Sequence, residues 1–274
     1  MKLKFIGNKI RPLDAQINKS EPSLVPKLPF SLQIVGQKGA SKSTTILNML
    51  LNKSILGGQF HEIYWISPTS SLDEKLDILK QTKGILKINY PLINEIKKNM
   101  KNSKRITDVT GERDVFEFNT SLTESNFIQD VSTDFLEEIT NDQKKVIQKY
   151  GKKLANEVLL IFDDCSSARK FWNSEITKKL VFNSRHVKIS LILSVQTYTS
   201  ISKAIRLNNS ILVLYATANE KEIQNIYQEN SNNTFKEFLK IFKSVTDTPF
   251  SFLTINYQND LKYRYINNFE EFII

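Results

Sequence analysis

A loop near the start of the chain carries residue types that are suited to holding phosphate groups. Residues 36–44 follow the Walker A pattern closely, in which backbone N–H groups surround phosphates at the N-terminus of a helix. Lys42 is expected to reach the β- and γ-phosphates of ATP, and the Ser43 hydroxyl to contact Mg²⁺. The predicted nucleotide-binding residues are Gly36, Gln37, Lys38, Gly39, Ala40, Ser41, Lys42, Ser43 and Thr44.

Ser41 is the departure of this loop from the Walker A pattern, which has glycine at that position. The position often needs a backbone conformation that glycine adopts easily, so serine is expected to carry a conformational cost. A chance turn before a helix is the alternative interpretation. The apolar strand before the loop and the apolar residues at helical spacing after it favour nucleotide binding.

Asp163 and Asp164 follow an uninterrupted apolar run at 158–162, which is typical of a strand buried on both faces of a parallel sheet. As a Walker B pair, Asp163 would hold Mg²⁺ through water, and Asp164 would be the base or orienter for the attacking water. A strand that ends in an ordinary polar turn is the alternative. The Walker A loop earlier in the chain favours the catalytic interpretation.

Gln196 and two arginines lie near a further apolar strand at 189–195. Gln196 ends that strand and is a candidate contact for the γ-phosphate or the water, with an ordinary surface glutamine as the alternative. Arg185 precedes the strand and Arg206 follows it, and either is a candidate to act across a subunit interface. A surface salt bridge is the alternative for both. Two histidines and the single Cys165 predict neither a metal site of these residues nor an intrachain disulfide.

The order of elements predicts an α/β fold. Strands, helices and a hairpin are expected at 30–35 (strand), 44–52 (helix), 61–67 (strand), 158–162 (strand), 174–183 (helix), 189–195 (strand), 211–215 (strand), 220–227 (helix), and 250–257 with 263–266 (hairpin). Helices between buried strands indicate a central, mainly parallel β-sheet flanked by helices. We therefore predict a basic N-terminal arm at 1–29 and a single P-loop domain at 30–274 that ends in a β-hairpin.

The net charge of +9 favours a polyanionic partner, either nucleic acid or an anionic membrane surface. Heavy use of lysine in an AT-rich genome is the alternative explanation of this charge. A basic run at 97–105 is a candidate DNA contact, although a solvated helix face is the more common outcome. No apolar stretch is long enough to predict a membrane span.

Taken together, these motifs resemble the FtsK–HerA superfamily of DNA-pumping ATPases. They are most similar to the poxvirus-type genome-packaging ATPases of large DNA viruses and virophages. The resemblance rests on the segments 36–44, 60–69, 159–164, 184–196 and 205–208. Asp164 departs from the wider superfamily, which usually has glutamate there. The resemblance implies a homo-oligomeric ring with ATP and Mg²⁺ at subunit interfaces and an arginine supplied by the neighbour, Arg185 or else Arg206.

The resemblance also implies a function, that of a double-stranded DNA translocase that packages a viral genome with a capsid or portal-vertex partner. Such a protein is expected in the virion or in the cytoplasmic viral factory of the host. A cellular or plasmid-type HerA-like DNA pump is one alternative. An ATP-binding structural or switch protein with little turnover is another, which Ser41 suggests.

Overall fold

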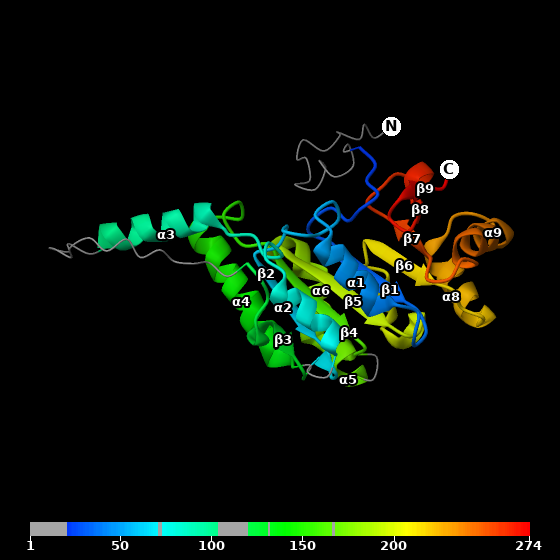
Figure 1. Ribbon diagram of the computed structural model, residues 1–274, viewed down its shortest axis with the longest axis horizontal. Coiled ribbons are helices and arrows are strands. Elements are labelled where there is room, and N and C mark those ends of the chain that lie inside the picture. Colours follow the sequence, from blue (N-terminus) through cyan, green and yellow to red (C-terminus); the bar gives the residue numbers. More distant parts are fainter. Residues whose placement is uncertain (1–20, 71–72, 104–119, 131, 166–167) are drawn as a thin grey trace, which may run out of the picture.

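The computed structural model describes residues 21–70, 73–103, 120–130, 132–165 and 168–274. Most of the predicted N-terminal arm and the end of the basic run, 104–105, lie outside the described residues, so the division at 29 and 30 stays a prediction. Figure 1 shows a central sheet with α3 projecting from one end of the body.

One sheet forms the centre of the described chain. Its strands are β1 (Ser31–Val35), β2 (Glu62–Ile66), β3 (Phe127–Ile128), β4 (Val158–Asp163), β5 (Ile189–Val195), β6 (Ile211–Tyr215), β7 (Phe252–Asn256), β8 (Tyr265–Asn267) and β9 (Glu271–Phe272). Their spatial order is β3-β2-β4-β5-β1-β6-β7-β8-β9. The strands from β3 to β6 in this order run parallel, and β7, β8 and β9 add antiparallel pairs at the other edge. The predicted mainly parallel sheet and C-terminal hairpin are both confirmed.

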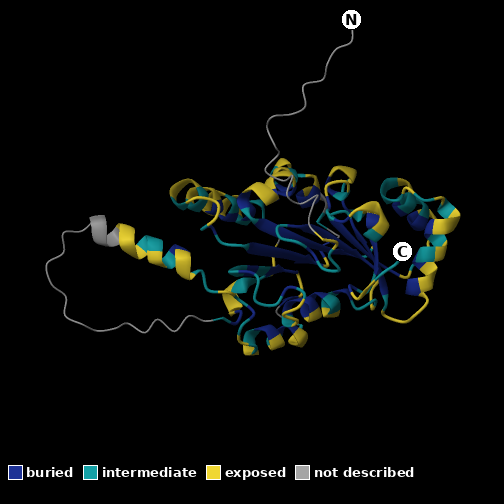
Figure 2. Cartoon of the chain, turned by 90° about the horizontal axis from the view of Figure 1, so that it is seen from above, coloured by how far each residue is buried: buried dark blue, intermediate teal, exposed yellow. Residues whose placement is uncertain are grey.

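Helices cover both faces of this sheet, whereas α3 projects away from it (Figure 1). The helices are α1 (Lys42–Leu51), α2 (Asp77–Gln81), α3 (Tyr90–Ser103), α4 (Thr133–Tyr150), α5 (Arg169–Asn173), α6 (Glu175–Asn183), α7 (Lys203–Arg206), α8 (Glu220–Asn230) and α9 (Phe235–Thr246). Short 3-10 turns are η3 (Glu74–Leu76), η4 (Glu124–Asn126), η5 (Ser184–Val187), η6 (Tyr198–Ser200) and η7 (Leu261–Tyr263). Figure 2 shows the buried sheet between the two helical layers.

Strand β4 shows why the sheet reads as apolar runs in the sequence. Val158, Leu160 and Phe162 pack into the core under α4, α5 and α6, while Leu159 and Ile161 pack into the core under α1 and α2. Because both faces are covered, apolar residues are needed at consecutive positions rather than at alternate ones. The same arrangement brings the carboxyl ends of β1, β4 and β5 to one edge of the sheet, where ligands bind in open α/β folds.

His61 lies just before β2, and its side chain is expected to make the free energy of unfolding depend on pH. Its Nδ1 accepts a hydrogen bond of 2.8 Å from the backbone N–H of Glu157. Burial, together with the charges of the nearby Lys87 and Lys188, lowers the His61 pKa from 6.5 to about 4. The folded state therefore favours the neutral imidazole. This contribution is fully present above pH 6.5 and is lost as the pH falls toward about 4.

We expect His61→Asn to lose less stability than the wild type between pH 7 and pH 4, because an amide oxygen accepts the same hydrogen bond without titrating. Urea unfolding midpoints across this range measure the effect. Equal pH dependence in the two proteins would contradict the assignment of a titrating role to His61.

Candidate nucleotide-binding site

The loop between β1 and α1 approaches β6 so closely that glycine is required at its first position. A Cβ atom on Gly36 would lie 3.0 Å from side-chain carbons of Tyr215 and from the Cβ of Ala40. Gly39 has a φ of 86°, in the left-handed region that glycine adopts without strain. The helix begins at Lys42, two residues earlier than predicted, so the loop ends directly at a helix N-terminus.

Ser41 immediately precedes α1 and adopts the left-handed conformation, with φ 71° and ψ 23°. Glycine, which the Walker A pattern has at this position, adopts this conformation without strain. Serine has a Cβ atom, so the same conformation costs conformational free energy. The side chain makes no capping hydrogen bond to the helix. Nothing in the described contacts of the Ser41 hydroxyl offsets the backbone strain.

Ser41→Gly is therefore expected to stabilise the protein by up to about 1 kcal/mol, because the left-handed strain is relieved while glycine loses more entropy on folding. ATP affinity should stay equal or become tighter. Ser41→Ala is the matched control, since it removes the hydroxyl and keeps the strain. Urea unfolding and calorimetric titration with an ATP analogue measure both effects. A large loss of affinity in both variants would show instead that the hydroxyl makes a needed contact.

Lys42 folds back onto its own loop. Its Nζ donates hydrogen bonds to the carbonyl oxygens of Gly36, at 2.7 Å, and Gln37, at 3.2 Å. The side chain is largely buried, and burial lowers the Lys42 pKa while the carboxylates of Asp163 and Asp164 oppose that shift. The amino group is thus bound to neutral carbonyl oxygens, and a phosphate group, which carries negative charge, could replace them as its acceptor.

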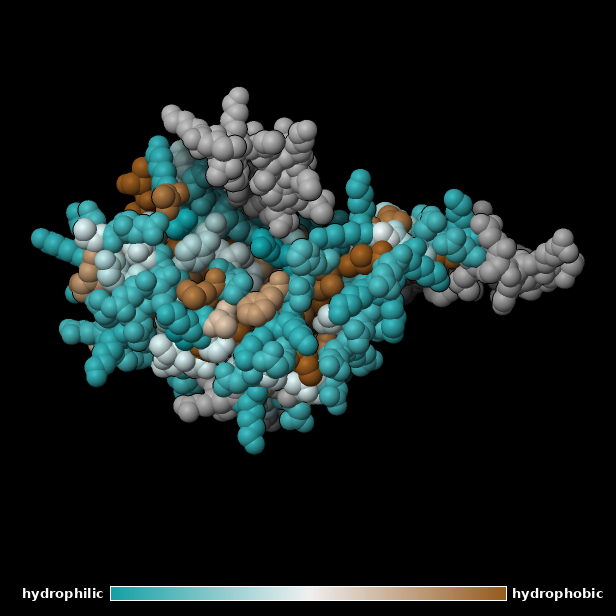
Figure 3. Space-filling model, turned by 180° about the vertical axis from the view of Figure 1, so that it is seen from behind, coloured by the Kyte–Doolittle hydropathy of each residue, from teal (hydrophilic) through white to brown (hydrophobic). Residues whose placement is uncertain are grey.

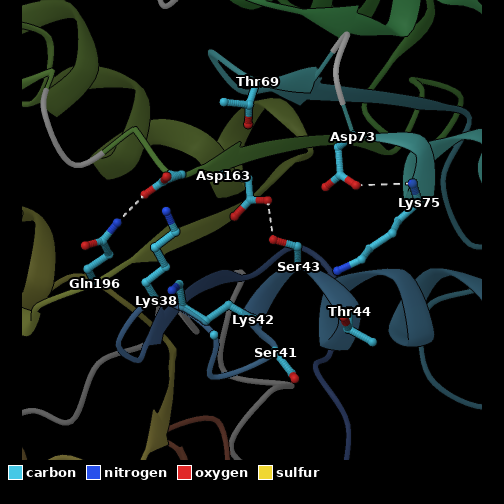
Figure 4. Close-up of a pocket in the computed structure, with 12 residues that line it drawn as sticks. Lys38, Ser41, Lys42, Ser43, Thr44, Thr69, Asp73, Lys75, Asp163 and Gln196 are labelled. Carbon is cyan, nitrogen blue, oxygen red and sulfur yellow. Dashed lines mark hydrogen bonds between the residues drawn. The ribbon is translucent and has the colours of Figure 1, made fainter.

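Ser43 and Asp163 form a pair of oxygen atoms at the floor of the site. The Ser43 hydroxyl donates to Asp163 Oδ2 over 2.6 Å, which joins the start of α1 to the end of β4 (Figure 4). Burial raises the pKa of Asp163, whereas the hydrogen bond from Ser43 and the charge of Lys42 lower it. A hydroxyl and a carboxylate in contact are the oxygen ligands that Mg²⁺ prefers, so these residues fit that ion.

Asp164 and Gln196 form the second pair, at the ends of β4 and β5. Gln196 Nε2 donates to Asp164 Oδ1 over 2.8 Å. Asp164 is exposed and has a φ of 53°, so the turn after β4 directs its carboxylate away from the core. The sequence predicted both residues but not that they contact each other.

A cavity of about 220 Å³ lies between these pairs and the loop. Its lining includes three residues that the sequence analysis missed, namely Thr69, Asp73 and Lys75. Figure 4 shows the Lys75 amino group directed toward the Ser43 side of the cavity. Thr69 lies in the segment 60–69 that contributed to the resemblance, whereas no motif marks Asp73 or Lys75.

The two candidate arginines lie apart from this cavity. Arg185 is exposed in η5, which precedes β5. It therefore lies at the amino-terminal end of that strand, whereas Gln196 lies at the carboxyl end. Arg206 forms an ion pair of 2.7 Å with Glu229, and its side chain is only 8% exposed. A further bond to the Ile201 carbonyl and a position over the Tyr198 ring occupy the rest of the guanidinium. These contacts hold the Arg206 side chain within its own subunit, and its catalytic role stays a prediction.

The face of the molecule shown in Figure 3 is mainly hydrophilic. Hydrophilic side chains cover most of the face in Figure 3, where apolar atoms form separate patches. Among the described residues, no helix combines the length and apolarity needed to cross a lipid bilayer. The same residues contain no cluster of three or more His, Cys, Asp or Glu side chains that could hold a metal ion.

Comparison with known proteins supports the predicted resemblance. Residues 123–256 match the family model described as Poxvirus A32 protein, just under half of the chain. The chain is 36% identical over 93 residues to the uncharacterized protein 075L of Invertebrate iridescent virus 6, covering 31% of this chain and 36% of that protein. It is 33% identical over 91 residues to the uncharacterized protein L437 of Acanthamoeba polyphaga mimivirus, covering 31% and 32%. The matches thus span about a third of the length of these relatives.

Among solved structures, the fold is similar to the genome packaging NTPase B204 from Sulfolobus turreted icosahedral virus 2 in complex with ATP-gammaS. The TM-score is 0.52 and the identity 14%, and the likeness covers 85% of this chain and 94% of that one. It confirms the predicted P-loop fold. The family match over residues 123–256 confirms the predicted resemblance to the poxvirus group.

Proposed function

We propose that this chain, which resembles the poxvirus A32 proteins over residues 123–256, is an ATPase that drives double-stranded DNA into a viral capsid. One observation carries the proposal. Lys42, the Ser43–Asp163 pair and the Asp164–Gln196 pair meet around a single cavity at one edge of a P-loop fold. The structural relative B204, a genome packaging NTPase, supports the same function.

Each side chain has a task in ATP hydrolysis. Lys42 exchanges the loop carbonyls for the β- and γ-phosphate oxygens and neutralises charge that develops on them. Ser43 and Asp163 would hold Mg²⁺, which would neutralise further phosphate charge. Asp164 is exposed to water and fixed by Gln196, so it orients the attacking water and accepts its proton. Lys38, which is exposed and lines the same cavity, adds positive charge near the phosphates.

Phosphate release with and without duplex DNA tests this function, with Asp164→Asn as the matched variant. We expect DNA to stimulate hydrolysis, and Asp164→Asn to bind ATP while hydrolysing it slowly, because only the water step needs the carboxylate. Slow turnover that ignores DNA would favour an ATP-binding switch protein instead. Normal hydrolysis by Asp164→Asn would place the base elsewhere.

DNA binding is proposed to be electrostatic and indifferent to sequence, because a packaging motor moves every part of a genome. The net charge of +9 supports contacts to phosphates. Affinity for unrelated duplexes should then be equal at fixed salt and fall steeply as salt rises. Strong discrimination between duplexes would contradict a packaging role. The capsid partner and a location in the virion or viral factory belong to the same proposal.

Arg185 is proposed to act on the nucleotide of a neighbouring subunit in a ring. It lies at the sheet edge opposite its own cavity and is exposed, so only a neighbour's site is within its reach. Arg185→Ala is expected to bind ATP normally and to hydrolyse it about 10³-fold more slowly. Mixing it with Lys42→Ala subunits, which retain Arg185, should restore part of the activity. Absence of rescue in confirmed mixed rings would remove this role.

A further inference from the structure

We propose that a second cavity, on the far side of the loop from Asp163, binds the purine ring of the nucleotide. The inference rests on the proposed nucleotide site. The cavity has a volume of about 500 Å³ and lies between α1 and the turns that precede β7 and follow β8. Ser41 and Thr44 line both this cavity and the phosphate cavity. In Figure 4 the Ser41 hydroxyl points away from Asp163.

The wall of this cavity is aromatic. Phe250 is 69% exposed, although an aromatic side chain gains stability from burial. Phe252 and Phe269 line the same cavity, are buried and pack edge to face with ring centroids 5.3 Å apart. A cavity that combines an exposed ring with a buried aromatic pair is suited to stacking against a flat, apolar, aromatic ligand.

The backbone around the cavity is strained at three of the residues that line it. Phe250, Asn268 and Phe269 have φ values of 64°, 49° and 61°, all in the left-handed region that non-glycine residues rarely adopt. Such residues cluster at ligand sites, where the surrounding structure holds them. Asn268 Oδ1 accepts a 2.8 Å hydrogen bond from the backbone N–H of Phe252, which ties the two turns together. The aromatic wall is thereby formed before a ligand arrives.

Polar groups at the rim are suited to the edge of a base that carries an amino group. Glu270 lies in the turn after β8 and is exposed, so its carboxylate accepts hydrogen bonds from donors in the cavity. Asn48 is exposed on α1 across the same cavity and offers both a donor and an acceptor. Adenine carries an exocyclic amino group that can donate to this carboxylate, whereas uracil has no exocyclic amino group.

Calorimetric titration with Mg²⁺ and three probes, ATP, UTP and inorganic tripolyphosphate, tests the proposal. We expect ATP to bind most tightly and tripolyphosphate least tightly. Phe250→Ala should weaken ATP binding about 5- to 150-fold, the range that corresponds to loss of one base–aromatic stack, and leave tripolyphosphate affinity unchanged. Phe250→Tyr should retain ATP affinity, because the ring remains. Glu270→Ala should lower the ratio of ATP affinity to UTP affinity, because the carboxylate that favours ATP is removed.

Leu261→Ala is the matched control, since Leu261 is 60% exposed and apolar but lies in η7, outside the residues that line the cavity. It should leave all three affinities unchanged. If Phe250→Ala binds ATP as tightly as the wild type, the base site is overturned even though tripolyphosphate still binds. If neither ATP nor tripolyphosphate binds the wild type, the proposed nucleotide site itself fails, and the base site with it.

Discussion

Lys42→Ala is expected to abolish ATP hydrolysis while the protein stays folded. The lysine supplies a positive charge where negative charge develops on the transferring phosphoryl group, and removal of a single such donor lowers turnover by about 10²- to 10³-fold or more. Within the part of the chain that the structure describes, its amino group donates hydrogen bonds to the carbonyls of Gly36 and Gln37. The fold should therefore tolerate its loss, because burying a cation is unfavourable in itself.

Single-turnover phosphate release and thermal unfolding by circular dichroism measure the two halves of this expectation. Lys38→Ala is the matched control, because Lys38 is a lysine of the same loop that lines the same cavity from an exposed position. We expect Lys38→Ala to reduce turnover much less than Lys42→Ala does. Near-normal turnover in folded Lys42→Ala would remove the P-loop assignment, and with it the tasks given above to Asp163 and Asp164.

The sequence predicted those parts of the site whose chemistry is local in the chain. The loop 36–44, the strand that ends in Asp163 and the strand before Gln196 each carry a pattern that a buried parallel sheet requires. Because the carboxyl ends of parallel strands share an edge, their proximity followed from the fold class alone. The structure adds the pairing, with Ser43 bound to Asp163 and Gln196 bound to Asp164.

The remaining features depend on backbone conformation and on contacts between distant segments. The conformational cost at Ser41 was predictable, because the Walker A pattern has glycine at that position. The left-handed conformation of Phe250 was not, because no motif covers that residue. Asp73 and Lys75 reach the phosphate cavity because η3 lies beside α1, which no local pattern reveals. The hairpin at the end of the chain was predicted, but not that its turns form a wall beside the nucleotide loop.

Arg206 shows how the same residue type serves two different purposes. In the sequence it was a reserve candidate for a catalytic arginine because it follows the strand that ends near Gln196. In the structure its guanidinium pairs with Glu229 through two hydrogen bonds, of 3.0 Å and 2.7 Å. Glu229 also accepts a bond from the Tyr198 hydroxyl. Burial raises the pKa of Glu229, but these hydrogen bonds outweigh it, so the net shift is downward and the carboxylate stays charged.

Arg206→Ala is therefore expected to lower the free energy of unfolding by about 3–5 kcal/mol, the loss typical when one partner of a buried ion pair is removed. The pair qualifies as buried, because the side chains of Arg206 and Glu229 are 8% and 13% exposed. Replacing both partners, as Arg206→Met with Glu229→Leu, should recover most of this loss, since no unpaired charge then remains. Lys203→Ala, at an exposed cation of the same helix, is the control and should change stability little.

Urea unfolding of the four proteins measures these differences, and phosphate release by each variant while folded separates stability from catalysis. If the ion pair is structural, folded Arg206→Ala should hydrolyse ATP at a rate close to that of the wild type. A variant that unfolds like the wild type but has lost hydrolysis would instead return Arg206 to the catalytic role. In that case the pair with Glu229 would have to open when subunits assemble, and the proposal for Arg185 would lose its support.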